Sequence, residues 1–207
     1  MKNRAPASAV LCFALAASAQ TGHHSTGSKE SPALIIPGLG RVNHPIRTRS
    51  AEAQQFFNQG LALVYGFNHE EAARSFRRAA ELDPASPMPY WGIALAVGPN
   101  YNDADIDRAR EKAAWDAIQK ARQIAASAPA REHDYVEALT KCYSDDPKAD
   151  LKALARTYRT AMKELSGRYP DDLDAAVLYA ASIMDLHPWD LWTQDGKSAE
   201  ERRSVRP

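Results

Sequence analysis

The residues from Gly60 to Pro84 constrain the fold of this chain more than any other stretch. Gly60 is a small residue within an apolar helical stripe, where it lets one helix approach its neighbour closely. Twelve positions later Ala72 begins the pattern Ala-x3-Phe-x2-Ala-x4-Pro, with Phe76 and Ala79 inside it and Pro84 at its end. Residues at these intervals share one helix face, and proline cannot continue a helix. The stretch therefore predicts two packed helices that end at Pro84.

Similar helical patterns cover most of the chain after residue 50. Seven apolar stripes at helical spacing are separated by short breaks rich in glycine, proline and asparagine, which predicts an all-α fold. We expect the helical region to span residues 51–192, after an irregular segment at 20–50 and before a polar, disordered tail at 193–207. Within the irregular segment, Leu34-Ile35-Ile36 is predicted to cover the first helices in an extended conformation. The stripes of the seven predicted helices begin near Phe56, Asn68, Trp91, Ile106, Tyr135, Leu151 and Leu173.

The start of the chain is typical of a secretory signal. Lys2 and Arg4 precede a short apolar run at 9–16, and Ala17-Ser18-Ala19 fits a cleavage site. The apolar run is too short to span a bilayer, so we expect cleavage after Ala19 and a periplasmic or extracellular protein. Cys142 would then be the only cysteine and no internal disulfide could form.

The overall charge argues against two classes of partner. The chain has 26 basic and 26 acidic residues, a formal net charge of +0. Nothing in this balance favours binding to nucleic acid or to an anionic membrane surface.

The helical region resembles the tetratricopeptide repeat (TPR) superfamily, in particular a branch of exported bacterial proteins. The resemblance extends from His44 to Trp192. The matching blocks are Phe56–Leu61, Tyr65–Ala72, Met88–Gly92, Gly98–Asn102, Arg131–Tyr135, Tyr169–Ala176 and Pro188–Trp192. Phe56 replaces the usual tryptophan and Leu63 the usual tyrosine, and both substitutions keep bulk. The resemblance implies antiparallel helix pairs stacked as a short superhelical solenoid, which acts as a binding scaffold.

Only the first repeat is well formed. Its closing proline is Pro84 and the next comparable one is Pro170, a separation of 170 − 84 = 86 residues. Two repeats of 34 residues would give only 68, so the second and third units carry insertions. The last stripe, from Leu173, resembles the first helix of a fourth repeat, but the polar residues after Trp192 provide no partner helix. We therefore expect the chain to be an N-terminal fragment whose last helix has an open apolar face.

Asparagines and one tyrosine are the candidate peptide-binding residues. Asparagine is a poor helix former, and its amide can hold the backbone of an extended peptide in a groove. Asn68 and Asn100 also have turn roles available to them. The candidates are Asn58, Asn68, Asn100, Asn102 and Tyr101.

No metal or catalytic site is expected from residue spacing. His44, His69, His133 and His187 lie beside predicted helix boundaries, and none forms a His-x3-His pair. The aspartates at 103, 105 and 107 are not followed by the glycine and glutamate that a calcium loop needs. The aspartates at 171, 172 and 174 are expected to begin a helix, where the helix dipole favours negative charge. Cys142 is expected to be half-buried and unreactive. No cofactor is expected.

Three functions remain open at this stage. The first is an exported scaffold without catalysis that binds a protein or peptide. The alternative is the N-terminal part of a metal-binding or metal-dependent envelope protein whose remaining ligands lie outside this chain. The third is an assembly subunit that associates with another copy through its open last helix.

Overall fold

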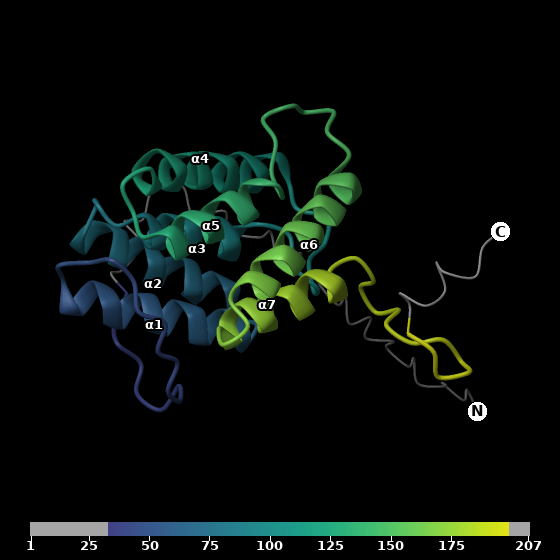
Figure 1. The fold of residues 1–207 in the computed structure, drawn as a ribbon, viewed down its shortest axis with the longest axis horizontal. Helices are drawn as coiled ribbons and strands as arrows, with labels where there is room; N and C mark the ends of the chain where they lie inside the picture. Colours follow the sequence, from purple (N-terminus) through teal and green to yellow (C-terminus); the bar gives the residue numbers. More distant parts are fainter. Residues whose placement is uncertain (1–32, 199–207) are drawn as a thin grey trace, which may run out of the picture. The chain divides into compact units, whose positions relative to one another are not determined.

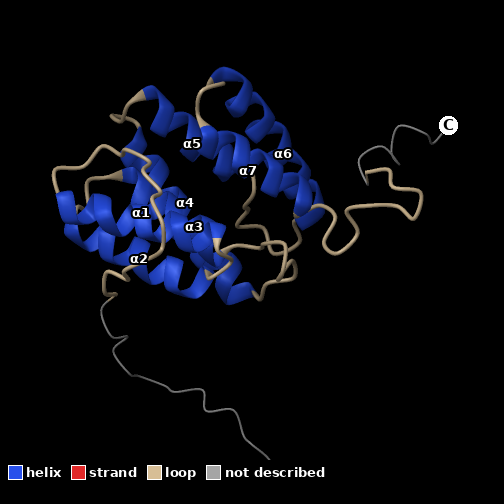
Figure 2. Ribbon diagram, turned by 90° about the horizontal axis from the view of Figure 1, so that it is seen from below, coloured by secondary structure: helices blue, strands red, loops and turns tan. Residues whose placement is uncertain are grey.

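The computed structural model describes residues 33–198, which belong to one compact unit, Pro32–Pro207. These residues form seven α-helices and no strand, apart from two isolated β-bridges (Figures 1 and 2). The all-α prediction is confirmed, while the superhelical solenoid stays a prediction. The helices are α1 (Ala51–Tyr65), α2 (His69–Leu82), α3 (Pro87–Val97), α4 (Arg108–Ala125), α5 (Ala130–Thr140), α6 (Leu151–Arg168) and α7 (Leu173–Met184).

The first two helices form as the Gly60–Pro84 pattern predicts. Ser50 and Asn68 cap α1 and α2, because each side chain accepts a hydrogen bond from a backbone N–H in the first turn. Ala72, Phe76 and Ala79 are fully buried along one face of α2. Gly60 of α1 lies against the Phe76 ring and leaves no room for a side chain. A small residue is therefore required where these helices meet.

Each helix packs against the next one along the chain. In addition, α1 contacts α3, and α3 contacts α5. Figure 1 shows α1, α2 and α3 side by side, with α6 crossing the view at an angle to them. The start of α7 also meets the end of α1, because the Tyr65 hydroxyl donates a 2.6 Å hydrogen bond to Asp174. Residues 109 positions apart in the sequence are joined in this way.

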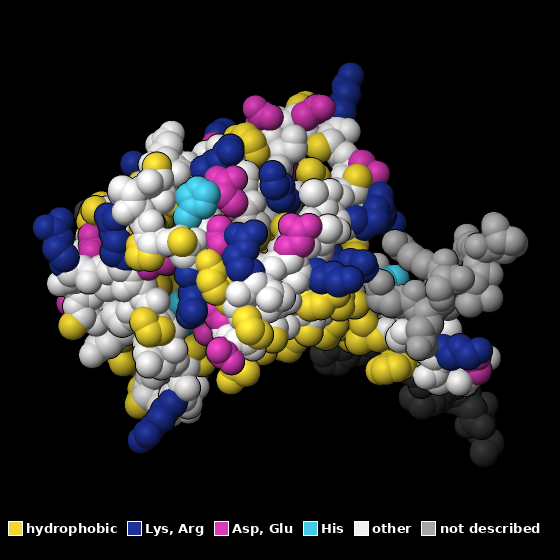
Figure 3. All heavy atoms as spheres, viewed as in Figure 1, with side chains coloured by type: hydrophobic (Ala, Val, Ile, Leu, Met, Phe, Trp, Pro, Cys, Tyr) yellow, Lys and Arg dark blue, Asp and Glu magenta, His cyan; other side chains and the backbone are white. Residues whose placement is uncertain are grey.

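One face of α7 is apolar and exposed. Leu173 is 77% exposed and Val177 46%, and Ala176 and Ala180 are exposed on the same side. Figure 3 shows hydrophobic side chains gathered where α7 lies in Figure 1. Within residues 33–198 no element covers this stripe, as the repeat pattern predicts for the last helix.

The segment before α1 is held by polar contacts more than by apolar cover. The Gln59 side chain accepts a hydrogen bond from Ile36 N–H at 2.7 Å and donates one to the Leu34 carbonyl at 2.9 Å. The prediction of an apolar cover is wrong for Leu34 and Ile35, because both side chains are exposed, whereas Ile36 is partly buried against the core as predicted. Ala33 and Ile46 are buried instead.

Two sequence predictions concern the ends of the chain. The signal at residues 1–19 and most of the tail lie outside the described residues. The part of the tail that is described forms a tight turn, in which Thr193 N–H donates to the Lys197 carbonyl at 2.8 Å. None of the described helices is sufficiently long and apolar to span a bilayer.

Candidate binding cavity

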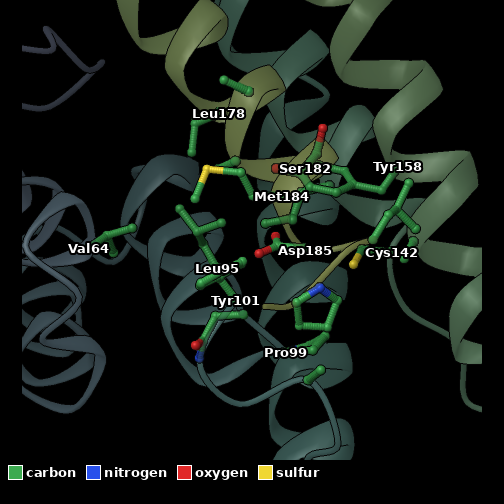
Figure 4. Close-up of a pocket in the computed structure, with 18 of the residues that line it drawn as sticks. Val64, Leu95, Pro99, Tyr101, Cys142, Tyr158, Leu178, Ser182, Met184 and Asp185 are labelled. Atoms are coloured by element: carbon green, nitrogen blue, oxygen red, sulfur yellow. The ribbon is translucent and has the colours of Figure 1, made fainter. Parts of the chain in front are cut away.

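A cavity of about 520 Å³ opens among six helices. It is lined by α1, α3, α5, α6 and α7, by His69 at the start of α2, and by the loops after α1, α3, α5 and α7. Its volume lies within the range of small-molecule and side-chain binding sites. Most of the lining is apolar, including Leu139 and Pro188. Figure 4 shows four further apolar residues of the lining, Val64, Leu95, Leu178 and Met184.

Close packing of α3 with the turn after α5 supports one wall of the cavity. The buried Tyr143 hydroxyl donates a 2.7 Å hydrogen bond to the Ala94 carbonyl. Gly98 ends α3 beside this hydroxyl, and a Cβ at Gly98 would lie only 2.1 Å from it. The glycine therefore permits the close approach that fixes Tyr143 and the neighbouring Cys142.

Asp185 is one of two acidic residues in the cavity lining, with Asp105. It caps the C-terminal end of α7, and Figure 4 shows its carboxylate among the side chains of Leu95, Met184 and Tyr101. Burial raises the pKa of Asp185 to about 7, an effect partly offset by a hydrogen bond from the backbone of Tyr101. A carboxylate in such apolar surroundings favours a cationic or hydrogen-bond-donating partner.

The other titratable groups of this wall stay neutral. Burial raises the pKa of the Cys142 thiol to about 12, and the nearby Asp185 charge adds to the effect. Burial also raises the pKa of Tyr143 and Tyr158. Because the thiolate is the nucleophilic form of cysteine, Cys142 is poorly suited to covalent catalysis.

His69 contributes unsatisfied polar atoms to the lining. Both of its ring nitrogens are buried without a hydrogen-bond partner, and burial lowers its pKa. The ring packs edge-on against Phe67, with centroids 6.4 Å apart. A neutral imidazole at this position can donate one hydrogen bond and accept another.

Two aromatic residues at the cavity rim have a left-handed backbone. Phe67 has φ of 59° and lines the cavity, while Trp189 has φ of 61° and packs against the lining residue Tyr101. The Tyr101 hydroxyl accepts a 3.1 Å hydrogen bond from the Trp189 backbone N–H. Bulky residues rarely adopt this conformation, and such strain is concentrated at functional sites.

The structure brings only two of the five candidate peptide-binding residues to this cavity. Asn100 and Tyr101 line it, although Asn100 Oδ1 also accepts hydrogen bonds from the backbones of Asn102 and Asp103. Asn102 is exposed beside them. Asn68 caps α2, and Asn58 accepts a hydrogen bond from the backbone of His44. A role for these residues in peptide binding stays a prediction.

Sequence reasoning missed the polar groups inside the cavity. Asp185 follows the last apolar residue of α7, and its sequence context resembles an ordinary helix end. The sequence pattern indicates His69 only as a histidine beside a helix boundary. Of the aspartates predicted to begin the last helix, Asp172 caps α7 and Asp174 lies in its first turn, and Asp107 caps α4. Outside the cavity lining, the side chains of Asp172, His44 and Asp174 form a separate, largely buried cluster.

Comparison with known proteins adds no relative. No protein-family model matches the chain, and neither the curated proteins nor the solved structures contain a match.

Proposed function

We propose that this chain is an exported, TPR-type binding scaffold that holds an extended peptide by its apolar side chains. The observation that carries the proposal is the apolar cavity of about 520 Å³ among α1, α2, α3, α5, α6 and α7. A space of this size accommodates one or two large side chains. The first helix of each predicted helix pair contributes to its lining, as do α6 and the first residue of α2.

The polar groups of the cavity favour a particular kind of peptide. Asp185 would pair with a basic side chain, because a nearby cation stabilises its ionised form. His69 and the amide of Asn100 would hydrogen-bond the peptide backbone at the rim. We therefore expect the bound segment to combine large apolar residues with one lysine or arginine.

Binding fits the lining better than catalysis does. The only nucleophilic thiol in the lining belongs to Cys142, and its raised pKa keeps it protonated. The partly buried carboxylate of Asp185 would act through charge complementarity with the ligand.

The test is a peptide selection on the full chain, followed by binding measurements on two variants. Ala180 is exposed at the cavity lining, so Ala180→Trp should obstruct the cavity without disturbing the core. We expect it to weaken binding of the selected peptides at least about tenfold, the loss expected when a central contact is removed. The control is Ala113→Trp, an exposed position on α4, which does not line the cavity.

Equal affinities of the two variants would contradict the proposal. Light scattering on the same samples would separate peptide binding from association of two copies through the exposed stripe of α7. A mass that rises with concentration, together with no peptide bound, would favour the assembly function instead.

A further inference from the structure

A cluster of metal-ligating side chains lies at the start of α7, apart from the cavity lining. His44 comes from the segment before α1, and Asp172 and Asp174 come from the first turn of α7. One ligand atom from each of the three residues lies within 4.8 Å of the other two. The direct contact is between His44 Nδ1 and Asp174 Oδ2, at 2.7 Å. An imidazole with two carboxylates is a ligand set that suits zinc.

Two buried polar atoms at this cluster lack a hydrogen bond of normal geometry. Asp172 Oδ1 accepts the capping hydrogen bond from Ala175 N–H at 3.2 Å, but Oδ2 accepts none. The Asp172 side chain is 5% exposed, and its nearest cation is Arg131, whose guanidinium nitrogen lies 3.7 Å from Oδ2. The fully buried Tyr135 hydroxyl lies close enough to Asp172 to interact with it, but neither this hydroxyl nor Asp172 Oδ2 makes a hydrogen bond of good geometry. Asp172 Oδ2 therefore has only weak contacts with Arg131 and Tyr135, and a bound cation would satisfy it better.

The surroundings hold the imidazole and one carboxylate in place. Backbone groups of His44 bond to α1, with its N–H donating to Asn58 at 3.2 Å and its carbonyl accepting from Gln54 at 2.8 Å. The ring packs against Phe57 and against the edge of Tyr135. Asp174 is oriented by the Tyr65 hydroxyl, 2.6 Å from Oδ1. Such outer contacts raise metal affinity, because they fix the ligands before the ion arrives.

The charges around the cluster favour a cation. Asp172 and Asp174 supply two carboxylates, and the buried Glu132 adds a third acidic group close to His44. Arg131 pairs with Asp172 and packs over the Tyr169 ring, and the Arg47 charge acts on Glu132. A divalent ion would balance the remaining negative charge.

We propose that His44, Asp172 and Asp174 form a binding site for a divalent transition metal ion, with Zn²⁺ as the first candidate. The ion would bond to a His44 nitrogen and to one oxygen of each aspartate, in place of the direct His44–Asp174 hydrogen bond. It would link the segment before α1 to the start of α7, two parts of the chain that are 130 residues apart. This proposal replaces the expectation, drawn from residue spacing, that no histidine binds metal within this chain.

Zinc titration of the chelator-treated full chain tests the site. We expect one zinc ion to bind per chain and to raise the thermal midpoint. Asp172→Asn keeps the cap of α7, since asparagine is also a good N-cap, but removes the anionic ligand. Its zinc affinity should fall about 10- to 100-fold. The matched control is Asp171→Asn, which removes an exposed charge one residue away and should keep the affinity.

Two further measurements keep the test decisive. Co²⁺ in place of zinc should give visible absorption bands with the unmodified chain and with D171N, and lose them with D172N. If D172N fails to fold, D174N provides the same comparison, because Asp174 caps no helix. No zinc binding by the unmodified chain, or zinc binding that survives both D172N and D174N, would overturn the proposal and leave only a hydrogen-bond network.

Discussion

Phe76 fills a space that two glycines leave open on the helices beside it. A Cβ at Gly60 in α1 would lie 2.6 Å from the nearest atom of the Phe76 ring, and one at Gly92 in α3 would lie 2.4 Å from it. Ordinary carbon contacts are much longer, and the ring is enclosed on both sides, so it cannot move away from either helix. The requirement for glycine at position 60 therefore comes from packing between helices rather than from backbone conformation.

Gly60→Ala should lower the free energy of unfolding by about 1–2 kcal/mol. Overpacking costs about 1–3 kcal/mol, and the better helix propensity of alanine returns part of this, up to about 1 kcal/mol. Chemical denaturation monitored by circular dichroism measures the change. The control is Gly167→Ala in α6, where no atom lies within 4 Å of the new Cβ. That variant should gain about 0.5–1 kcal/mol, and a similar gain for both variants would contradict the packing argument.

At the scale of the helices, most boundaries follow from local signals. Asp107, Asp150 and Asp172 each cap a helix, and the glycine-proline breaks end the stripes where the structure ends α3 and α6 to within a few residues. Such signals can be read from a single sequence because the cap, the stripe and the break lie within a few residues of one another. The last apolar stripe is predicted to begin near Leu173, and α7 begins at that residue.

The carboxylate at the end of α7 has a measurable consequence for stability. Asp185 lies at the negative end of the helix dipole, in apolar surroundings, and burial raises its pKa from 3.8 to about 7. Between these two values the folded chain holds a proton that the unfolded chain has released. The contribution of Asp185 to the free energy of unfolding therefore falls as pH rises from about 4 to about 7.

Asp185→Asn should remove this dependence. At pH 8 the variant should be more stable than the unmodified chain by a few kcal/mol, at most about 4, and the difference should vanish below pH 4. Asp83, Asp134 and Asp174 have lowered pKa values and act in the opposite direction, but they are present in both proteins and cancel in the comparison. Urea denaturation from pH 4 to 8 measures the difference in free energy of unfolding between D185N and the unmodified chain. Asp171→Asn is the control. Parallel curves for D185N and the unmodified chain would refute the assignment.

At the scale of the whole molecule, the functional candidates depend on contacts that no local pattern records. The cavity combines residues from Val64 to Pro188, and the His44 cluster joins positions 130 residues apart. The sequence identified His44 and Asp172 as separate helix-boundary residues, and it identified Tyr101 as a recognition residue. The sequence could not predict that these residues lie close together in space, because the contact between α7 and α1 depends on packing between distant elements. For the same reason, the sequence does not indicate that Asp185 lines a cavity.

The central claim is that a ligand peptide binds in the cavity among α1, α2, α3, α5, α6 and α7. The four methionines give a direct test. Met184 lines the cavity, whereas Met88 and Met162 are buried outside its lining. With ¹³C-labelled methionine methyl groups, a selected peptide should shift the Met184 signal in proportion to occupancy and leave those of Met88 and Met162 nearly unchanged. An unmoved Met184 signal at saturating peptide would place the binding site elsewhere and contradict the claim.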